Sequence, residues 1–108
     1  IYERFLNLSK ALHEASYPDL DVDLCLLLES VFLHVSQNQS PYTVSELIAR
    51  KDLGSQATMH ARLKKMIAMG YLELVLDLKD QRVKYVTLTE KSKDYFYHMN
   101  QSLHKALK

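Results

Sequence analysis

The sequence contains little glycine, proline and cysteine, and it has no long uninterrupted apolar run. Two glycines and two prolines occur in 108 residues, where average usage gives about eight and five, so turns should be few and the helices long. The single cysteine, Cys25, cannot form an internal disulfide, and its leucine-rich surroundings are typical of a small buried apolar group. The most apolar stretch, Leu24–Val35, is interrupted by polar residues and falls short of the roughly 20 residues that cross a bilayer. We therefore expect neither redox chemistry nor a membrane partner.

Length and composition indicate one globular domain that spans residues 1–108. Hydrophobic residues make up 47% of the chain and charged residues 25%, close to the averages of soluble proteins, which argues against a disordered tail. The chain starts at Ile1, and no basic flank with an apolar stretch follows it. We therefore expect a trimmed or processed chain that works in the cytoplasm.

Charge is divided unevenly along the chain. Residues 1–54 carry four Lys or Arg and eight Asp or Glu, whereas residues 55–108 carry ten and five. Such polarity is typical of a protein with a cationic face for a polyanion, but it is also compatible with lysines that only solubilise a helix. The asymmetry alone does not decide between the two.

The spacing of apolar residues predicts a mainly α fold with a small β-hairpin. Apolar residues recur every three or four positions up to Gly70, and the period then changes to about two. The predicted helices run from Ile1 to about Ala15, from Leu20 to Gln37, from Thr43 to about Lys51, from Ser55 to about Met69, and from Glu90 to the end. The predicted strands are Tyr71–Leu76 and Val83–Leu88.

Capping signals support these helix starts. Asp19 or Asp21 can cap the second helix, Thr43 and Glu46 form a capping box, and Ser55 and Thr89 can cap the last two helices. The second helix is apolar around nearly its whole circumference, which indicates packing on several sides. The polar segment 36–41 should be a loop. The last helix carries an apolar seam that needs a partner, either the first helix of the same chain or the last helix of another chain.

A short capped helix, a four-residue turn, a second helix with a polar outer face and a charged hairpin follow one another in the order of a winged helix-turn-helix. The second helix, residues 55–69, is about as wide as the DNA major groove, roughly 12 Å, and could read base edges there. The hairpin tip, residues 77–82, could contact the phosphate backbone or the minor groove. The candidate DNA-binding residues are Ser55, Gln56, Thr58, His60, Arg62, Lys64, Lys65, Lys79 and Arg82.

The chain resembles the winged-helix region of the multiple antibiotic resistance regulator (MarR) family over about half its length. The most specific element is the Asp-x-Arg sequence at the hairpin tip, followed by a strand and Leu-Thr-Glu-Lys. The matching segments are Thr43–Leu47, Ser55–Met59, Met66, Gly70–Leu72, Asp80–Arg82 and Thr87–Lys91.

The resemblance implies roles for residues and a division of the domain. It implies that Arg82 enters the minor groove, that Asp80 orients it, and that helices 1–16 and 90–108 dimerise beside the helix-turn-helix 43–69 and the wing 71–88. It also implies a small aromatic or lipophilic effector, and a homodimer that places one helix in each of two successive major grooves. The expected dimerisation residues are Ile1, Phe5, Leu8, Leu12, Phe96, Met99, Leu103 and Leu107.

Three functions remain open at this point. The first is a homodimeric repressor of transcription that binds a pseudo-palindromic double-stranded DNA site. The second is a switch that responds to a small molecule, and the third is a protein-interaction module that has kept the fold without binding DNA. The five histidines are scattered without the spacing of metal ligands, and no catalytic set or phosphate loop is visible, so we expect neither a metal site nor an enzyme.

Overall fold

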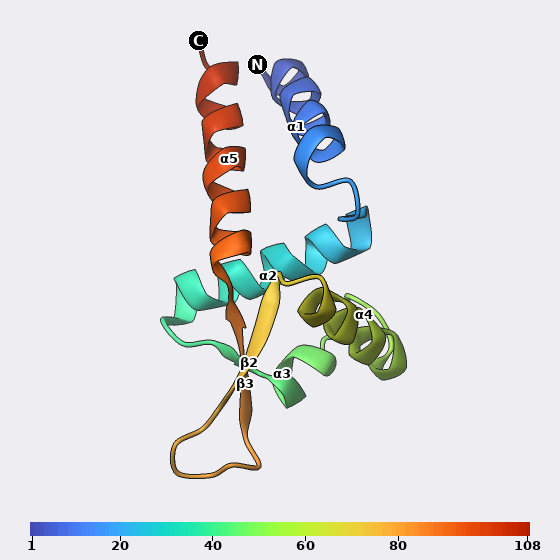
Figure 1. The fold of residues 1–108 in the computed structure, drawn as a ribbon, viewed down its shortest axis with the longest axis vertical. Coiled ribbons are helices and arrows are strands. Elements are labelled where there is room, and N and C mark those ends of the chain that lie inside the picture. Colours follow the sequence, from blue (N-terminus) through green and yellow to red (C-terminus); the bar gives the residue numbers. More distant parts are fainter.

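Five helices and three short strands build the fold of residues 1–108 in the computed structural model (Figure 1). Helices α1 and α5 lie side by side at one end of an elongated molecule, 48 Å by 26 Å by 23 Å, and the β2–β3 hairpin projects from the other end. Helix α2 crosses between these ends. The elements are α1 (Tyr2–Ser16), α2 (Val22–Asn38), β1 (Tyr42–Thr43), α3 (Val44–Ile48), α4 (Gln56–Ala68), β2 (Leu72–Leu76), β3 (Lys84–Leu88) and α5 (Glu90–Ala106).

Side chains at the helix starts confirm the predicted caps. Of the two candidates for α2, it is Asp21 that accepts a hydrogen bond from the Leu24 amide at 2.9 Å. The capping box of α3 is complete, because Thr43 Oγ1 accepts from the Glu46 amide at 3.1 Å while Glu46 accepts from the Thr43 amide at 2.9 Å. Each bond satisfies an amide that the first helical turn leaves without a partner.

The sheet contains one strand more than predicted. Strand β3 lies in the centre and pairs antiparallel with both β2 and the two-residue β1. Tyr42 faces Val86 across the β1–β3 pair, so β1 exists only because a distant strand supplies its partner. The predicted loop 36–41 is also shorter, because α2 continues to Asn38 and ends at Gln39 in a left-handed conformation, φ 55°.

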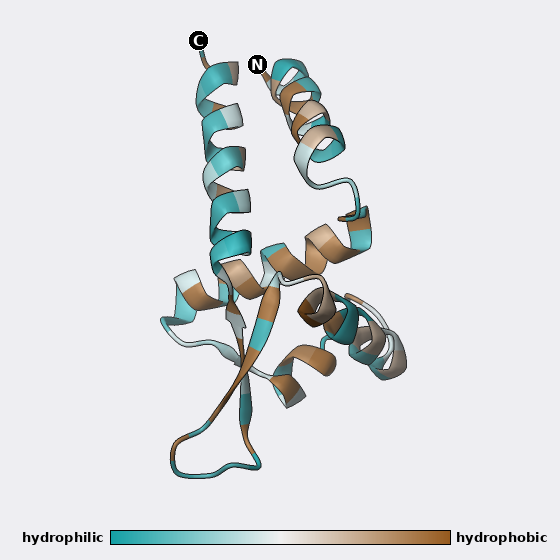
Figure 2. Ribbon diagram, viewed as in Figure 1, coloured by the Kyte–Doolittle hydropathy of each residue, from teal (hydrophilic) through white to brown (hydrophobic).

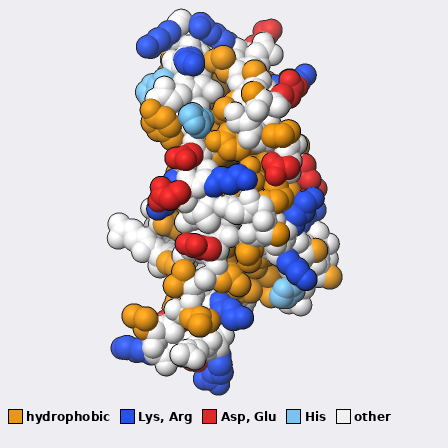
Figure 3. All heavy atoms as spheres, viewed as in Figure 1, with side chains coloured by type: hydrophobic (Ala, Val, Ile, Leu, Met, Phe, Trp, Pro, Cys, Tyr) orange, Lys and Arg blue, Asp and Glu red, His pale blue; other side chains and the backbone are white.

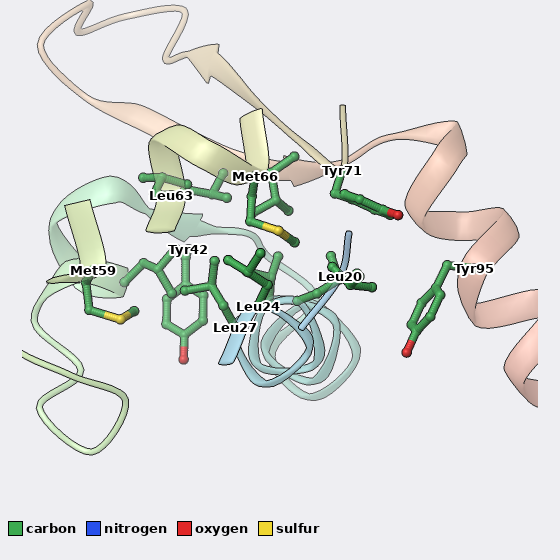
Figure 4. Packing of buried hydrophobic residues seen from close by; sticks show 14 of the residues in the cluster. Leu20, Leu24, Leu27, Tyr42, Met59, Leu63, Met66, Tyr71 and Tyr95 are labelled. Atoms are coloured by element: carbon green, nitrogen blue, oxygen red, sulfur yellow. The ribbon is translucent and has the colours of Figure 1, made fainter. Parts of the chain in front are cut away.

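The core lies between α2, α4 and the sheet (Figure 4). Helix α2 contributes Leu24, Leu27, Leu28 and Val31, each at most 2% exposed. Helix α2 packs on several sides, as expected, against α4, β1 and β3 and through Phe32 against Phe96 of α5. One further apolar face of the helix is open to solvent. That face contains Val22, Leu26 and Leu33, which are 74%, 48% and 51% exposed.

The first and last helices pack against each other within one chain. Tyr95 on α5 donates from its hydroxyl to Nε2 of His13 on α1 at 2.9 Å, because Nδ1 of the same ring donates to the Ser9 carbonyl at 2.8 Å. The Ser9 hydroxyl also lies 3.7 Å from the Met99 sulfur. Part of the predicted apolar seam is therefore satisfied by the chain's own α1.

The two helices also differ in the hydropathy of their residues (Figure 2). Helix α5 is largely hydrophilic along its visible face, whereas α1 and α2 carry several hydrophobic turns. None of the five helices combines the length and hydropathy needed to cross a membrane.

Candidate nucleic-acid interface

Helix α4 presents a polar face outward because its inner face is anchored in the core. Met59, Leu63 and Met66 are at most 4% exposed and point toward α2 (Figure 4), as the spacing predicts. The opposite side of the helix is exposed and uncharged or cationic. It contains Gln56, His60, Lys64 and Lys65, all exposed.

The turn before α4 depends on a glycine and on two hydroxyl groups. Gly54 has a φ of 151°, and a Cβ at this position would lie 3.3 Å from Thr58 Cγ2. Ser55 Oγ accepts from the Thr58 amide at 3.2 Å and donates to Thr58 Oγ1 at 2.9 Å. Both hydroxyls therefore begin the helix, and each keeps acceptor capacity toward the outside.

Arg62 is engaged inside the protein. Its Nη1 donates to the Leu53 carbonyl at 2.7 Å, and its Nη2 lies 3.3 Å from the Asp23 carboxylate on α2. The side chain is 26% exposed and lies on the flank of α4 that faces α2. Arg62 thus ties the turn and α4 to α2, and its charge is already compensated by Asp23.

A second arginine, Arg50, also holds the helix-turn-helix in place, and no sequence pattern singles it out. Arg50 donates to the hydroxyls of Ser30 and Tyr42 and binds Asp52 through two hydrogen bonds of 2.8 Å and 2.7 Å. These bonds raise the pKa of Arg50 and hold the pKa of the Asp52 carboxyl below its ordinary value. The link joins α2, β1 and the turn between α3 and α4.

The wing is shaped by Asp77, which sequence reasoning also missed. Its Oδ2 accepts from the Lys79 and Asp80 amides at 3.0 Å and 2.9 Å, and its Oδ1 accepts from the Tyr85 hydroxyl at 3.0 Å. These three hydrogen bonds lower the pKa of Asp77, the Asp80 amide contributing most. An aspartate that bonds the amides two and three residues ahead is a local turn signal, so Asp77 could have been found from the sequence.

Asp80 and Arg82 form a fork at the end of the wing. Asp80 Oδ1 accepts from the Arg82 amide at 3.1 Å and from Arg82 Nε at 3.0 Å, and Oδ2 accepts from Nη2 at 3.2 Å. The Arg82 guanidinium lowers the pKa of the Asp80 carboxyl. The arginine side chain nevertheless remains 91% exposed, so it is held in one direction while its outer edge stays accessible.

Comparison with known proteins places this architecture in a family. A family model described as a winged helix DNA-binding domain matches residues 22–92, from α2 to the first turn of α5. The chain belongs to the winged helix DNA-binding domain family. The match contains the helix-turn-helix and the whole wing of this winged-helix chain.

A related regulator and several solved structures agree with this assignment. The HTH-type transcriptional regulator TcaR of Staphylococcus aureus is 32% identical over 101 residues, which are 91% of this chain and 66% of that protein. The winged-helix chain thus spans just under two thirds of the length of this relative.

The solved structures show the same fold at lower identity. S. aureus MepR bound to ethidium bromide has a TM-score of 0.75 at 14% identity and covers 97% of this chain and 71% of its own. Streptococcus pneumoniae FabT in complex with DNA has a TM-score of 0.65 at 20% identity, covering 90% and 63%. S. aureus MarR in complex with salicylate and kanamycin has a TM-score of 0.65 at 24% identity, covering 98% and 65%. The MarR-like winged helix-turn-helix predicted from the sequence is confirmed.

The predicted dimerisation residues of the winged-helix chain fall into two groups. Phe96 stacks on Phe32 of α2 with ring centroids 4.3 Å apart, and Leu12 and Met99 also pack against the core. In contrast, Ile1, Leu103 and Leu107 are 76%, 46% and 59% exposed at the α1–α5 end, and Phe5 and Leu8 are half-buried. The exposed group is available to a further surface.

Proposed function

We propose that the chain is a sequence-specific regulator of transcription that binds double-stranded DNA. The observation that carries the proposal is the placement of two cationic elements. The outer face of α4 and the Arg82 fork are both exposed, and both lie at the end of the molecule away from the α1–α5 pair (Figure 1). Family membership supports the same function.

In this proposal α4 enters the major groove and the wing reaches the adjacent minor groove. Gln56 suits the bidentate pairing that an amide makes with adenine. His60, Lys64 and Lys65 contact bases or phosphates from the exposed face, and Ser55 and Thr58 use the acceptor capacity that the cap leaves. Arg62 acts indirectly, because its guanidinium holds α4 against Asp23 instead of facing outward.

The regulator would act as a homodimer and repress by covering a promoter. Ile1, Leu103 and Leu107 expose apolar surface at the α1–α5 end, and such surface favours a second copy. Two-fold symmetry would then place the two α4 helices about 10 to 10.5 base pairs apart on a pseudo-palindromic site. We expect the dimer to use α1 and α5.

Selection of duplexes from a random pool tests the proposal. We expect the recovered sequences to form a palindrome with half-sites about one helical turn apart, and analytical ultracentrifugation to show two copies of the chain per duplex. Recovery of no preferred duplex at physiological salt, together with binding only to a protein partner, would favour the interaction module instead.

A small-molecule response is a second candidate, supported by one cavity. A pocket of about 450 Å³ lies at the α1–α2 junction and is lined by Leu20, Val22, Cys25 and Leu26, with His13, Asp21 and Glu29. Its size and apolar lining suit a small aromatic or lipophilic effector. A ligand of this site should compete with duplex binding by the wild-type chain, and Leu26→Asp should abolish that competition while DNA affinity stays unchanged.

A further inference from the structure

Lys84 occupies a position where the strand pattern calls for an apolar residue. Side chains alternate along β3, so Lys84, Val86 and Leu88 point to the same face of the sheet. Val86 is fully buried and belongs to the core, whereas Lys84 is exposed. The lysine therefore stands on the inner face of the sheet, just beyond the point where the core ends.

Two hollows between the wing and the helix-turn-helix meet at this lysine. The first has a volume of about 300 Å³ and lies between the start of α3 and the wing, with Ser45, Arg82 and Lys84 in its walls. The second has a volume of about 540 Å³ and lies between α4 and β2, with His60, Lys64 and Lys84 in its walls. Lys84 is thus shared by both hollows and connects α4 to the wing.

The charge of these hollows has one sign. No aspartate or glutamate lines either of them, and the ion pairs of the chain include neither Lys64 nor Lys84. Figure 3 shows cationic side chains around an apolar surface between the wing and the helices at this end of the molecule. The region therefore favours an extended anion with apolar parts, as a sugar–phosphate chain is.

In duplex DNA, the anion that would lie in this region is the sugar–phosphate backbone. One sugar–phosphate strand separates a major groove from the neighbouring minor groove, so a protein with a helix in one groove and a wing in the other must straddle that strand. We propose that His60, Lys64, Lys84 and Arg82 form a phosphate groove that seats this strand, with Lys84 as its central contact. The inference rests on the proposed function, and it assigns to Lys84 a role that neither the sequence nor the comparisons indicate.

A phosphate contact has a distinctive signature. It positions the protein on DNA but carries no base information, so losing it weakens specific and non-specific binding alike. It also releases a condensed counterion, and removing one contact makes the plot of log affinity against log salt shallower by about 0.9. Gln56 would behave differently, because loss of a base contact relaxes sequence preference and leaves the salt slope unchanged.

The experiment compares Lys84→Gln with a matched control on α5, at a lysine that lines neither hollow. Lys93→Gln removes an exposed lysine of α5 that pairs with Glu90 at 3.6 Å. We expect Lys84→Gln to reduce the salt slope by about 0.9 for both the selected duplex and a random duplex. Lys84→Arg and Lys93→Gln should both keep the wild-type slope, because the first keeps the cation and the second lies outside the groove. Thermal unfolding of each variant checks that the fold is retained.

Duplexes with single neutral methylphosphonates locate the contact. For the wild-type chain, affinity should fall when the modification lies on the strand between the major-groove and minor-groove contacts. Lys84→Gln should be insensitive to the modification at that same position.

The outcomes separate this inference from the proposed function. If the wild type selects a duplex but Lys84→Gln keeps the wild-type salt slope, or stays sensitive to every methylphosphonate, the phosphate groove is overturned and DNA binding stands. If the wild type selects no duplex, both the phosphate groove and the proposed function fall.

Discussion

Helices α1 and α4 are both amphipathic, yet the protein attaches them in different ways. Helix α4 buries Met59, Leu63 and Met66 in the main core, whereas α1 contains no fully buried residue. Helix α1 is held by half-buried side chains and by polar contacts to α5, among them the bond between His13 and Tyr95. Apolar anchoring leaves the outer face of α4 free to be polar, while α1 still exposes apolar residues that its own chain does not cover.

Helix α4 is therefore firmly anchored in the core, whereas α1 leaves part of its apolar surface exposed. Tyr2 and Leu6 on α1 are 64% and 50% exposed, and Ile1, which precedes the helix, is 76% exposed. So much exposed apolar surface is unusual at one end of a monomer. If a second copy covers them, the stability of α1 should depend on concentration, and that of α4 should not.

The largest effect is expected for Met59→Ala. Removing a fully buried side chain leaves a cavity, and we expect a loss of about 2–5 kcal/mol in the free energy of unfolding. Chemical denaturation measures this loss. Leu6→Ala on α1 is the matched control and should change unfolding of the monomer by less than about 0.5 kcal/mol. Equal losses for both variants would contradict the contrast between the two helices.

Two tyrosines on the core test the polar attachment of α1. Tyr95→Phe removes the hydroxyl that His13 accepts from, and should cost about 1 kcal/mol because the half-buried imidazole loses its partner. Burial raises the pKa of Tyr71 to about 12, and its hydroxyl has no hydrogen-bond partner, so Tyr71→Phe should be neutral or stabilising. Thermal unfolding of the two variants should therefore move in different directions.

Arg82→Ala should change DNA binding without changing the stability of either helix. Arg82 is 91% exposed and bonded only to Asp80, so its loss should leave the melting temperature unchanged. If Arg82 neutralises one phosphate, the salt slope of DNA affinity should become shallower by up to about one unit. A slope and an affinity equal to those of the wild type would remove the wing from the mechanism.

Amide hydrogen exchange should report the incomplete attachment of α1 directly. In dilute solution, amides of α1 should exchange faster than those of α4, because few buried apolar contacts oppose local opening. Protection of α1 should rise with protein concentration if dimerisation covers it. Constant protection of α1 across concentrations would argue against α1 as a dimer element.

The smallest effect is a pH response confined to the wing. Because the folded wing lowers the pKa of Asp77 and Asp80 below the ordinary value of 3.8, their hydrogen bonds are fully formed above that value and are lost as pH falls below it. NMR signals of the Arg82 side chain should therefore stay constant from pH 7 to about pH 5 and change only below about pH 4, while those of α4 core residues persist.

Much of the helix-turn-helix could be predicted from the sequence because its signals are local. The capping box of Thr43 and Glu46, the cap at Ser55 and the inner face of α4 each depend on residues within a few positions of one another. Asp77 belongs to the same class, since the amides that it accepts from are two and three residues away.

The features that could not be predicted depend on distant pairs. Strand β1 needs Val86 opposite Tyr42, and the inward direction of Arg62 needs Asp23 on another helix. Lys84 could not be singled out from the sequence, because one lysine in a strand forms no recognisable pattern. Its proposed role depends on the two hollows that it lines.

For this protein, residue order alone dictates where each helix begins, which of its faces is apolar and where the charged hairpin turns, since caps, periodicity and turn chemistry act over a few residues. Tertiary packing decides that Arg82 is exposed while Arg62 bonds to other parts of the protein. It also decides which apolar face of α2 remains exposed. These outcomes require contacts between segments separated by tens of residues, and no local pattern encodes such contacts.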